Sequence, residues 1–150
     1  MAVYQTNSPE ETEQLARRVG ERLRDGDVIA YRGGMGMGKT AFTRGLAAGM
    51  GIGEELVSSP TFALINEYRK NGRRLCHFDM YRIDSYDDLY STGFFDYLDQ
   101  DAVLAIEWSE NIQGLDVLPK GTIWITISRT GESSRSIEIE GGERFENLGD

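Results

Sequence analysis

A glycine-rich run at residues 33–40 limits the folds open to this chain more than any other stretch of its sequence. It reads G-G-M-G-M-G-K-T and matches the pattern G-x-x-x-x-G-K-[ST]. The mostly apolar residues 27–32 before it have the pattern of a β-strand, and residues 41–46 after it have that of a helix. Strand, loop and helix in this order predict a phosphate-binding loop, and therefore a nucleotide-binding protein.

The residue types in this run have a chemical reason. Glycines lack a Cβ atom, so consecutive backbone N–H groups can turn inward around phosphate oxygens, and the following helix directs its positive dipole end at the same anion. We expect Lys39 to reach the β- and γ-phosphates and the Thr40 hydroxyl to bind Mg²⁺, which prefers oxygen ligands. An accidental glycine-rich turn is the alternative, and the flanking strand and helix argue against it. The residues expected to hold the nucleotide are Gly33, Gly34, Met35, Gly36, Met37, Gly38, Lys39 and Thr40.

Length and composition predict one folded domain over residues 1–150. A chain of 150 residues is long enough to bury a single core without disulfides. Its one cysteine, Cys76, lies in a strand-like run, so we expect it to pack as a small apolar residue. The N-terminus has no signal pattern, and no apolar run reaches the roughly 20 residues that a membrane helix requires. These features predict a soluble, cytoplasmic protein with no membrane contact.

The charge balance limits the partners that the chain can bind. The sequence has 25 acidic and 16 basic residues, for a formal net charge of −9. Such a surface repels a polyphosphate backbone, which disfavours tight nucleic-acid binding by this chain alone. The basic residues 69–70 and 73–74 flank a turn, and we interpret them as solvated charges rather than as a nucleic-acid contact.

The first helix is predicted from its capping residues. Ser8 is a good N-cap, Pro9 suits the first helical position, and Glu11 completes a capping box. From Leu15, apolar residues recur at every fourth position, and Gly26 is expected to end the helix.

The remaining pattern predicts alternating strands and helices. Asn71-Gly72 marks a tight hairpin turn. Residues 102–108 read as a buried central strand, Gly93 divides a helical segment into two short helices, and the acidic tail beyond residue 141 reads as loosely held. Together the segments predict a three-layer α/β P-loop fold with a mixed, mostly parallel central sheet and a C-terminal β-hairpin. The expected strands are residues 27–32, 62–68, 74–79, 102–108, 124–127 and 136–140.

A P-loop enzyme also needs a carboxylate to hold the metal or an attacking water. Asp79 ends the strand-like run 75–78, and Glu107 ends the more apolar run 103–106. We therefore assign the metal role to Glu107, directly or through water, and a water-orienting or switch role to Asp79. For each residue the alternative is a solvated acid at the end of a strand.

Three further residues draw attention by their position. Thr61 lies in the first polar segment after the predicted P-loop helix, where nucleotide switches often place a hydroxyl that senses the γ-phosphate, and its alternative is an ordinary turn residue. Trp108 is either a core anchor or, beside Glu107, a lid or partner contact. His77 is the only histidine, and we expect a structural hydrogen bond rather than metal ligation.

Four motifs together resemble the TsaE family, formerly called YjeE. They are residues 33–40, S-P-T-F at 59–62, H-F-D-M-Y-R at 77–82 and I-E-W at 106–108. The resemblance extends over nearly the whole chain. It implies an α/β P-loop domain with a mixed sheet and a small bacterial ATPase. Such ATPases work with TsaD and TsaB in making threonylcarbamoyladenosine on tRNA.

The resemblance also implies residue roles. It places ATP phosphates on residues 34–39, Mg²⁺ on Thr40 and Glu107, and essential roles on Asp79 and Trp108. Segments near Pro9 and Gly131 correspond to those that approach the adenine. The family loop usually reads G-D-L-G-A-G-K-T, and here the residues that replace Asp, Leu and Ala are Gly34, Met35 and Met37.

The functional hypothesis is a Mg²⁺-dependent ATPase that resets the TsaD/TsaB complex and does not itself transfer the threonylcarbamoyl group. It would meet tRNA only through the complex and turn over slowly alone. One alternative is a non-hydrolytic, nucleotide-gated interaction module. The other is a small-molecule kinase, against which residues 92–101 argue because they contain no Arg or Lys for a lid.

Overall fold

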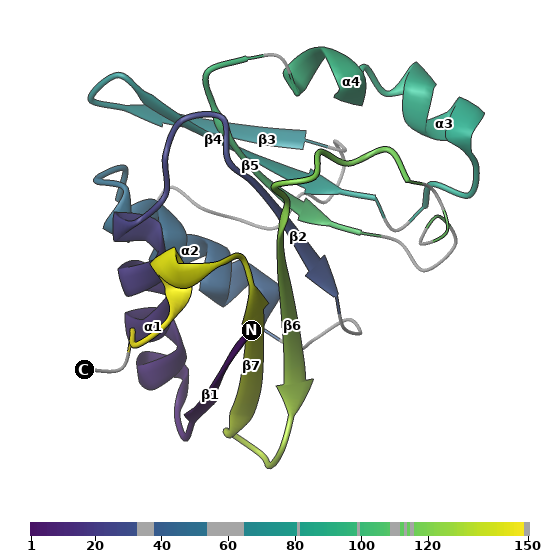
Figure 1. The fold of residues 1–150 in the computed structure, drawn as a ribbon. Coiled ribbons are helices and arrows are strands. Elements are labelled where there is room, and N and C mark those ends of the chain that lie inside the picture. The colour runs from purple at the N-terminus through teal and green to yellow at the C-terminus, as the bar shows by residue number, and fades with distance from the viewer. Residues whose placement is uncertain are drawn as a thin grey trace.

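The computed structural model describes residues 1–32, 38–53, 65–80, 82–98, 100–108, 112, 114 and 116–148. These residues form a seven-stranded sheet with helices on both faces (Figure 1). The strands are β1 (Ala2–Thr6), β2 (Val28–Arg32), β3 (Ile65–Lys70), β4 (Arg73–Asp79), β5 (Val103–Glu107), β6 (Ile123–Arg129) and β7 (Arg135–Glu140). The helices are α1 (Pro9–Glu21), α2 (Lys39–Gly49), α3 (Tyr86–Ser91), α4 (Phe94–Tyr97) and the short 3₁₀ helix η3 (Glu143–Phe145).

The sheet is parallel in the middle and antiparallel at both edges. Its order is β1-β7-β6-β2-β5-β4-β3, and β6, β2, β5 and β4 run parallel to one another. The hairpins β3–β4 and β6–β7 add antiparallel strands on either side. The β3–β4 turn forms as predicted, because Asn71 and Gly72 both adopt the positive φ that a tight hairpin turn requires. This mixed sheet confirms the predicted fold class.

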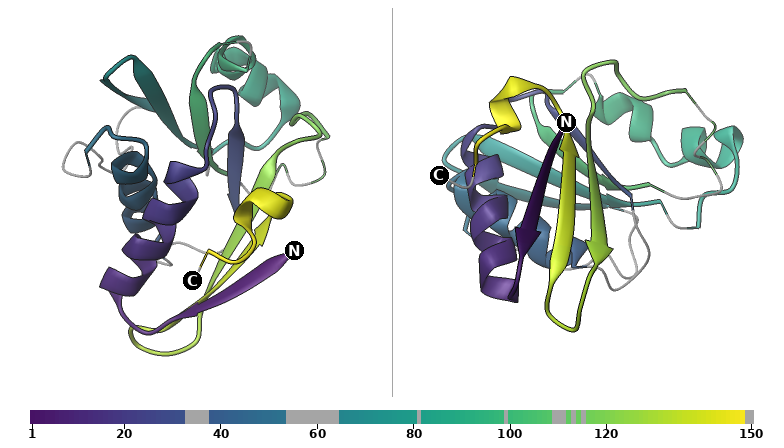
Figure 2. Two further views of the ribbon diagram at one scale, coloured as in Figure 1. Left: turned by 60° about the vertical axis from the view of Figure 1, so that its left-hand side comes forward. Right: turned by 60° about the horizontal axis from the view of Figure 1, so that its bottom comes forward.

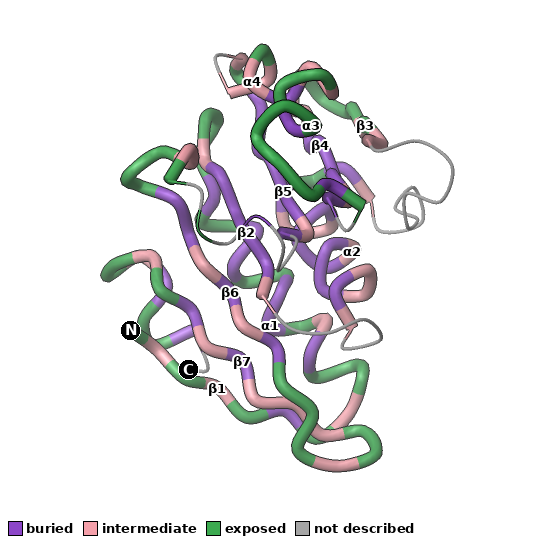
Figure 3. Tube along the Cα trace, turned by 90° about the vertical axis from the view of Figure 1, so that its right-hand side faces the viewer, coloured by how far each residue is buried: buried purple, intermediate pink, exposed green. Residues whose placement is uncertain are grey.

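Two apolar layers enclose the sheet. One cluster joins α1 and α2 to the face of the sheet that includes Ile29, Leu75 and Val103. The other joins Leu89 of α3 and Phe94 of α4, with neighbouring loop residues, to the opposite face. Figure 2 shows α1 and α2 side by side on their face of the sheet, and Figure 3 shows that the middle strands are largely buried. The predicted three-layer arrangement is therefore present.

α1 and α2 pack unusually closely through glycines. A Cβ atom added to Gly49 would lie 2.1 Å from the Arg17 carbonyl oxygen, and one added to Gly20 would lie 2.4 Å from the Leu46 carbonyl oxygen. Real Cβ atoms do not approach backbone this closely, so these positions require glycine. The contact fixes α2, and with it the start of that helix, against α1.

The first helix begins as predicted and ends earlier. The Glu11 amide donates to the Ser8 side chain at 3.1 Å, while the Glu11 carboxylate accepts from the Asn7 amide at 3.0 Å. α1 ends at Glu21, five residues before Gly26. Gly26 has φ +93° and belongs to the turn that leads into β2, so its glycine signal marked the turn rather than the helix end.

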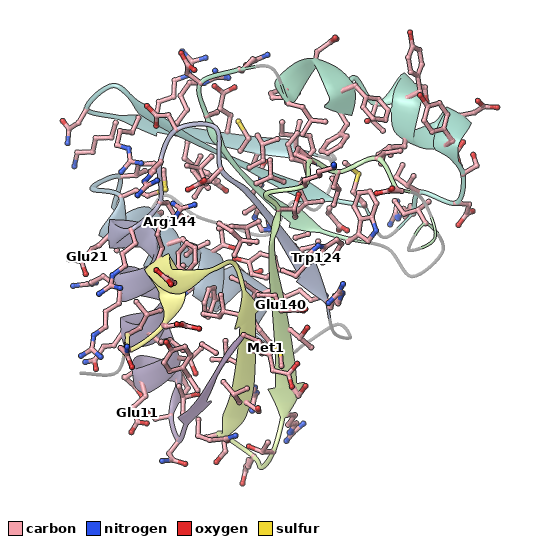
Figure 4. The ribbon with its side chains drawn as sticks, viewed as in Figure 1. Met1, Glu11, Glu21, Trp124, Glu140 and Arg144 are labelled. Atoms are coloured by element: carbon pink, nitrogen blue, oxygen red, sulfur yellow. The ribbon has the colours of Figure 1, made fainter. Side chains whose placement is uncertain are left out.

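Two segments differ from the sequence-based expectations. β1 was not predicted, and it pairs with β7 at the edge of the sheet. The tail beyond residue 141 is not loosely held over its described part, because Phe145 and Leu148 are buried and Arg144 makes two hydrogen bonds to Asp27, at 2.8 and 3.0 Å. Arg144 is labelled in Figure 4. No helix in the part of the chain that the structure describes has the length and apolar character needed to cross a membrane.

Candidate nucleotide site

Three parallel strands end together at one edge of the sheet. In the strand register Glu107 of β5 lies between Tyr31 of β2 and Asp79 of β4. Asp79 and Glu107 are therefore direct neighbours across the ladder, about 4.8 Å apart at the backbone. In open α/β sheets ligands bind outside the carboxyl ends of parallel strands, so the region beyond the C-terminal ends of β2, β4 and β5 is the candidate site.

The two acids also share a face of the sheet. Alternation along β4 puts Asp79 on the same side as Leu75, and alternation along β5 puts Glu107 on the same side as Val103. Leu75 and Val103 belong to the cluster that contacts α1 and α2. Both carboxylates therefore belong to the face of the sheet that α2 covers.

α2 begins with a backbone arrangement suited to an anion. Its N-cap, Gly38, has φ +99° and provides no side-chain cap, so this residue leaves the first N–H groups of the helix to other acceptors. Lys39, the first residue of α2, is 4% exposed, and Thr40 is half-buried. A helix N-terminus with a lysine at its first position favours a bound phosphate. Residues 33–37 and Thr61, which were predicted to complete this site, lie outside the described residues.

A buried hydroxyl pair ties α2 to β2. The Thr43 hydroxyl donates to the Lys39 carbonyl oxygen at 2.8 Å and lies 2.9 Å from the Tyr31 hydroxyl. Since the one Thr43 hydrogen is already donated, the Tyr31 hydroxyl is the donor of the second bond. Complete burial raises the Tyr31 pKa, which keeps this hydroxyl protonated. Sequence reasoning missed the pair, although a threonine four residues after the lysine was an available signal.

His77 holds the Glu107 carboxylate. The His77 Nε2 and Glu107 Oε2 atoms are 2.8 Å apart, the His77 side chain is fully buried and the Glu107 side chain is 13% exposed. A carboxylate only accepts, so Nε2 is assigned as the donor. The other ring nitrogen, Nδ1, has no hydrogen-bond partner within the described residues. The predicted structural hydrogen bond is confirmed, but its partner was not foreseen.

Trp108 is a core residue in this structure. Its side chain is 4% exposed and belongs to the apolar cluster on the α3–α4 side, together with Phe78. Its backbone N–H donates to the Tyr31 carbonyl oxygen at 3.4 Å, which extends the pairing of β5 with β2. The expectation of a lid or partner contact is therefore corrected, because so little of the ring is accessible. The interpretation as a core anchor holds.

An arginine that sequence reasoning missed lies at the end of β2. The Arg32 guanidinium donates a hydrogen bond to the Glu140 carboxylate of β7 at 2.9 Å, and its central carbon is 4.1 Å from the centre of the Trp124 ring. Figure 4 labels Trp124 and Glu140 on adjacent strands. These contacts hold the residue that precedes the glycine-rich run against β6 and β7.

The two segments expected near the adenine lie at one end of the molecule. Pro9 is the first residue of α1, and Gly131 lies in the β6–β7 turn, where its carbonyl accepts from Arg129 Nε at 3.0 Å. The pairing of Thr6 with Arg135 brings the start of α1 and this turn to the same end of the sheet, as Figures 1 and 2 show. The structure therefore brings these two segments together, as it does Asp79 and Glu107.

The donor set fits a magnesium nucleotide. Mg²⁺ binds hard oxygen ligands and generally takes one or two carboxylates together with phosphate oxygens and water. Asp79, Glu107 and the Thr40 hydroxyl supply such oxygens, and Lys39 supplies a positive charge at the helix start. The buried His77 donor orients one of these carboxylates.

The model of one protein family, described as "Threonylcarbamoyl adenosine biosynthesis protein TsaE", matches residues 6–137. This chain belongs to the TsaE family. The matched range includes the glycine-rich run, both strand-end acids and the β6–β7 turn. The resemblance read from the four motifs is thereby confirmed.

Individual TsaE relatives match most of the chain. The tRNA threonylcarbamoyladenosine biosynthesis protein TsaE of Bacillus subtilis is 36% identical over 146 residues, which cover 97% of this chain and 89% of the relative. The TsaE of Treponema pallidum is 35% identical, with 89% of this chain and 96% of the relative covered. The TsaE of Aquifex aeolicus is 32% identical, with 88% and 90% covered.

A solved structure agrees with the fold of this TsaE-family chain. The crystal structure of Bacillus subtilis YdiB superposes with a TM-score of 0.72 at 32% sequence identity. The alignment covers 98% of this chain and 90% of that one. The likeness therefore includes both antiparallel edges of the sheet as well as its parallel centre.

Proposed function

We propose that this chain is the ATP-binding and hydrolysing subunit of the bacterial machinery that installs threonylcarbamoyl on adenosine of tRNA. The observation that carries the proposal is the pairing of Asp79 with Glu107 on the face that α2 covers. Membership of a family that functions in threonylcarbamoyladenosine biosynthesis supplies the pathway. The acids, the lysine and the helix start supply the chemistry.

Each residue of the site has a proposed role in binding or hydrolysing the nucleotide. Lys39 and the N–H groups at the start of α2 bind phosphate oxygens, and Thr40 with Glu107 would hold Mg²⁺, which supplies charge stabilisation when bound. Asp79 orients the attacking water. His77 keeps the Glu107 carboxylate in place through the bond at 2.8 Å.

Further residues complete the proposed site. Residues 33–37 and Thr61 lie outside the described residues; their proposed roles are to bind the phosphates through main-chain amides and to sense the γ-phosphate. Pro9 and Gly131 mark the adenine side. Trp108 contributes from the core, where it supports the end of β5.

The proposed role is to reset a complex of TsaD and TsaB homologues, with hydrolysis slow until they are bound. The chain does not transfer the threonylcarbamoyl group itself. Its net charge of −9 supports this division, because an acidic subunit leaves tRNA binding to its partners. In this proposal residues 1–150 act as a single P-loop ATPase domain that works in the cytoplasm.

The test replaces the lysine at the start of α2. Lys39→Ala should abolish both ATP hydrolysis and tRNA modification by the chain reconstituted with TsaD and TsaB. Lys70→Ala, at the end of β3 beside the hairpin turn, is the matched control and should retain both activities. Modification that continues at the normal rate with the inactive ATPase would refute the proposed cycle.

A non-hydrolysable ATP analogue tests the requirement for hydrolysis separately. The proposal expects a single round of modification at most with the analogue. Repeated rounds would show that the nucleotide acts only as a gate for partner docking.

A further inference from the structure

We propose that α3 and α4 form a docking surface for a positively charged protein partner. The surface consists of three aromatic side chains, Tyr86, Tyr90 and Phe95, and we call it the aromatic surface. It lies on the side of the sheet opposite α2, so an occupant there leaves the candidate nucleotide site accessible. The inference goes beyond the proposed function, which names partners but no contact face, and rests on it for the choice of test partner.

The aromatic surface is exposed to solvent. Tyr86 is 48% exposed and Tyr90 is 67% exposed, and they lie one helical turn apart on α3. Their rings stack with centroids 6.4 Å apart, and the Phe95 ring of α4 lies 5.7 Å from one and 6.2 Å from the other. Tyrosine supplies large contact area at low entropic cost and is enriched at protein interfaces.

The surface is anchored to the core beneath it. Phe94 is fully buried and contacts the Phe95 ring at 5.6 Å and the Phe78 ring of β4 at 5.3 Å. On α3, Leu89 is fully buried in the apolar cluster that also contains Phe78 and Phe94. The rings are therefore arranged before a partner arrives, which lowers the entropic cost of binding.

The charges around the rings select the partner. Residues 83–101 contain six aspartates and no lysine or arginine. Five of these aspartates are exposed in the structure. They are Asp84, Asp87, Asp88, Asp96 and Asp101.

This charge disfavours three of the possible occupants. A second copy of the chain would bring one group of aspartates against another. Nucleic acid and an anionic lipid surface carry the same sign of charge and are repelled as well. A protein surface that places Lys or Arg around an apolar recess fits both features, because its cations meet the aspartates and can stack on the tyrosine rings.

The experiment measures binding of the full chain to a purified complex of TsaD and TsaB from the same organism by calorimetry. The variant Tyr86→Ser/Tyr90→Ser should bind about 30-fold more weakly, as expected for the loss of two interface aromatics. The variant Asp87→Lys/Asp96→Lys should bind more weakly and lose most of the salt dependence of its association rate.

Matched controls change the same chemistry elsewhere on the molecule. Val3→Ser removes an apolar side chain that is 53% exposed on β1, and Glu21→Lys reverses an exposed charge at the end of α1. Both should bind as the unmodified chain does. Circular dichroism and thermal unfolding confirm that each variant is folded.

The possible results separate the docking proposal from the proposed function. Equal affinity of the aromatic-surface variants and the controls would overturn the docking proposal and leave the proposed function intact. If the unmodified chain shows no affinity for TsaD and TsaB, both the docking proposal and the assignment of partners are wrong. Sedimentation of the chain alone provides one more check, since a dimer lost in Tyr86→Ser/Tyr90→Ser would identify a second copy as the occupant.

Discussion

Replacing Gly49 by alanine should force α1 and α2 apart. Gly49 is the last residue of α2, and a Cβ atom there would lie 2.1 Å from the Arg17 carbonyl oxygen and 2.9 Å from the Glu21 amide nitrogen. Both neighbours are backbone atoms of α1, so no side-chain rotation can relieve the contact. The helices must separate, because their backbones are rigid elements.

The size of the effect follows from this geometry. An ordinary carbon–oxygen contact is about 3.3 Å, so the backbones have to part by roughly 1.2 Å at this point. Overpacking of a well-packed interface costs about 1–3 kcal/mol, and the higher helix propensity of alanine returns at most about 1 kcal/mol. Because the clash is with backbone, we expect a net loss near 2 kcal/mol in the free energy of unfolding. For a domain of this size the melting temperature should fall by roughly 4–8 °C.

Urea unfolding followed by circular dichroism measures this loss. Gly121→Ala is the matched control, because a Cβ atom at Gly121 would meet nothing within 4 Å and the residue has no positive φ. The control should unfold within about 0.5 kcal/mol of the unmodified chain. A Gly49→Ala chain as stable as this control would refute the reasoning from close helix contact.

Two further predictions concern β4. Replacing His77 by leucine removes the donor to Glu107 and should weaken binding of Mg²⁺·ATP about tenfold. The variant His77→Gln keeps an N–H donor and should weaken binding less. Equal affinities of the two variants in calorimetry would contradict the role assigned to this hydrogen bond. Burial raises the Cys76 pKa to about 11 from its ordinary value of 9.0, so folding disfavours the thiolate and the free energy of unfolding should fall as pH rises from about 9 to 11. Cys76→Ala should show a flatter pH dependence over that range in denaturant titrations, and an unchanged slope would show that another group is responsible.

The predictable parts of the molecule were those with local signals. Asn71-Gly72 specified a hairpin turn through backbone preference alone, and the apolar run before Glu107 specified a buried strand. Glycine, proline and capping residues act within a few positions of the chain, so one sequence is enough to read them. The loop motif likewise predicted a helix from residue 41 onward, and α2 begins slightly earlier, at Lys39.

The parts that escaped prediction depend on distant residues. β1 is a five-residue strand whose partner, β7, lies at the other end of the chain. The tail was read as loose because its charges outnumber its apolar residues, yet Phe145 and Leu148 bury completely against the first cluster. The bond of His77 to Glu107 joins neighbouring strands, and its geometry depends on a register that composition does not specify.

The register that pairs Asp79 with Glu107 has a consequence for regulation. Adjacent strands are joined by backbone hydrogen bonds, so no partner can change the spacing of these two residues without breaking the centre of the sheet. Under the proposed function, control over turnover must therefore act on the segments that bring a nucleotide or water to the acids, while the backbone that carries the acids stays in place. Natural variation in catalytic rate should accordingly concentrate in connecting segments rather than in the strands.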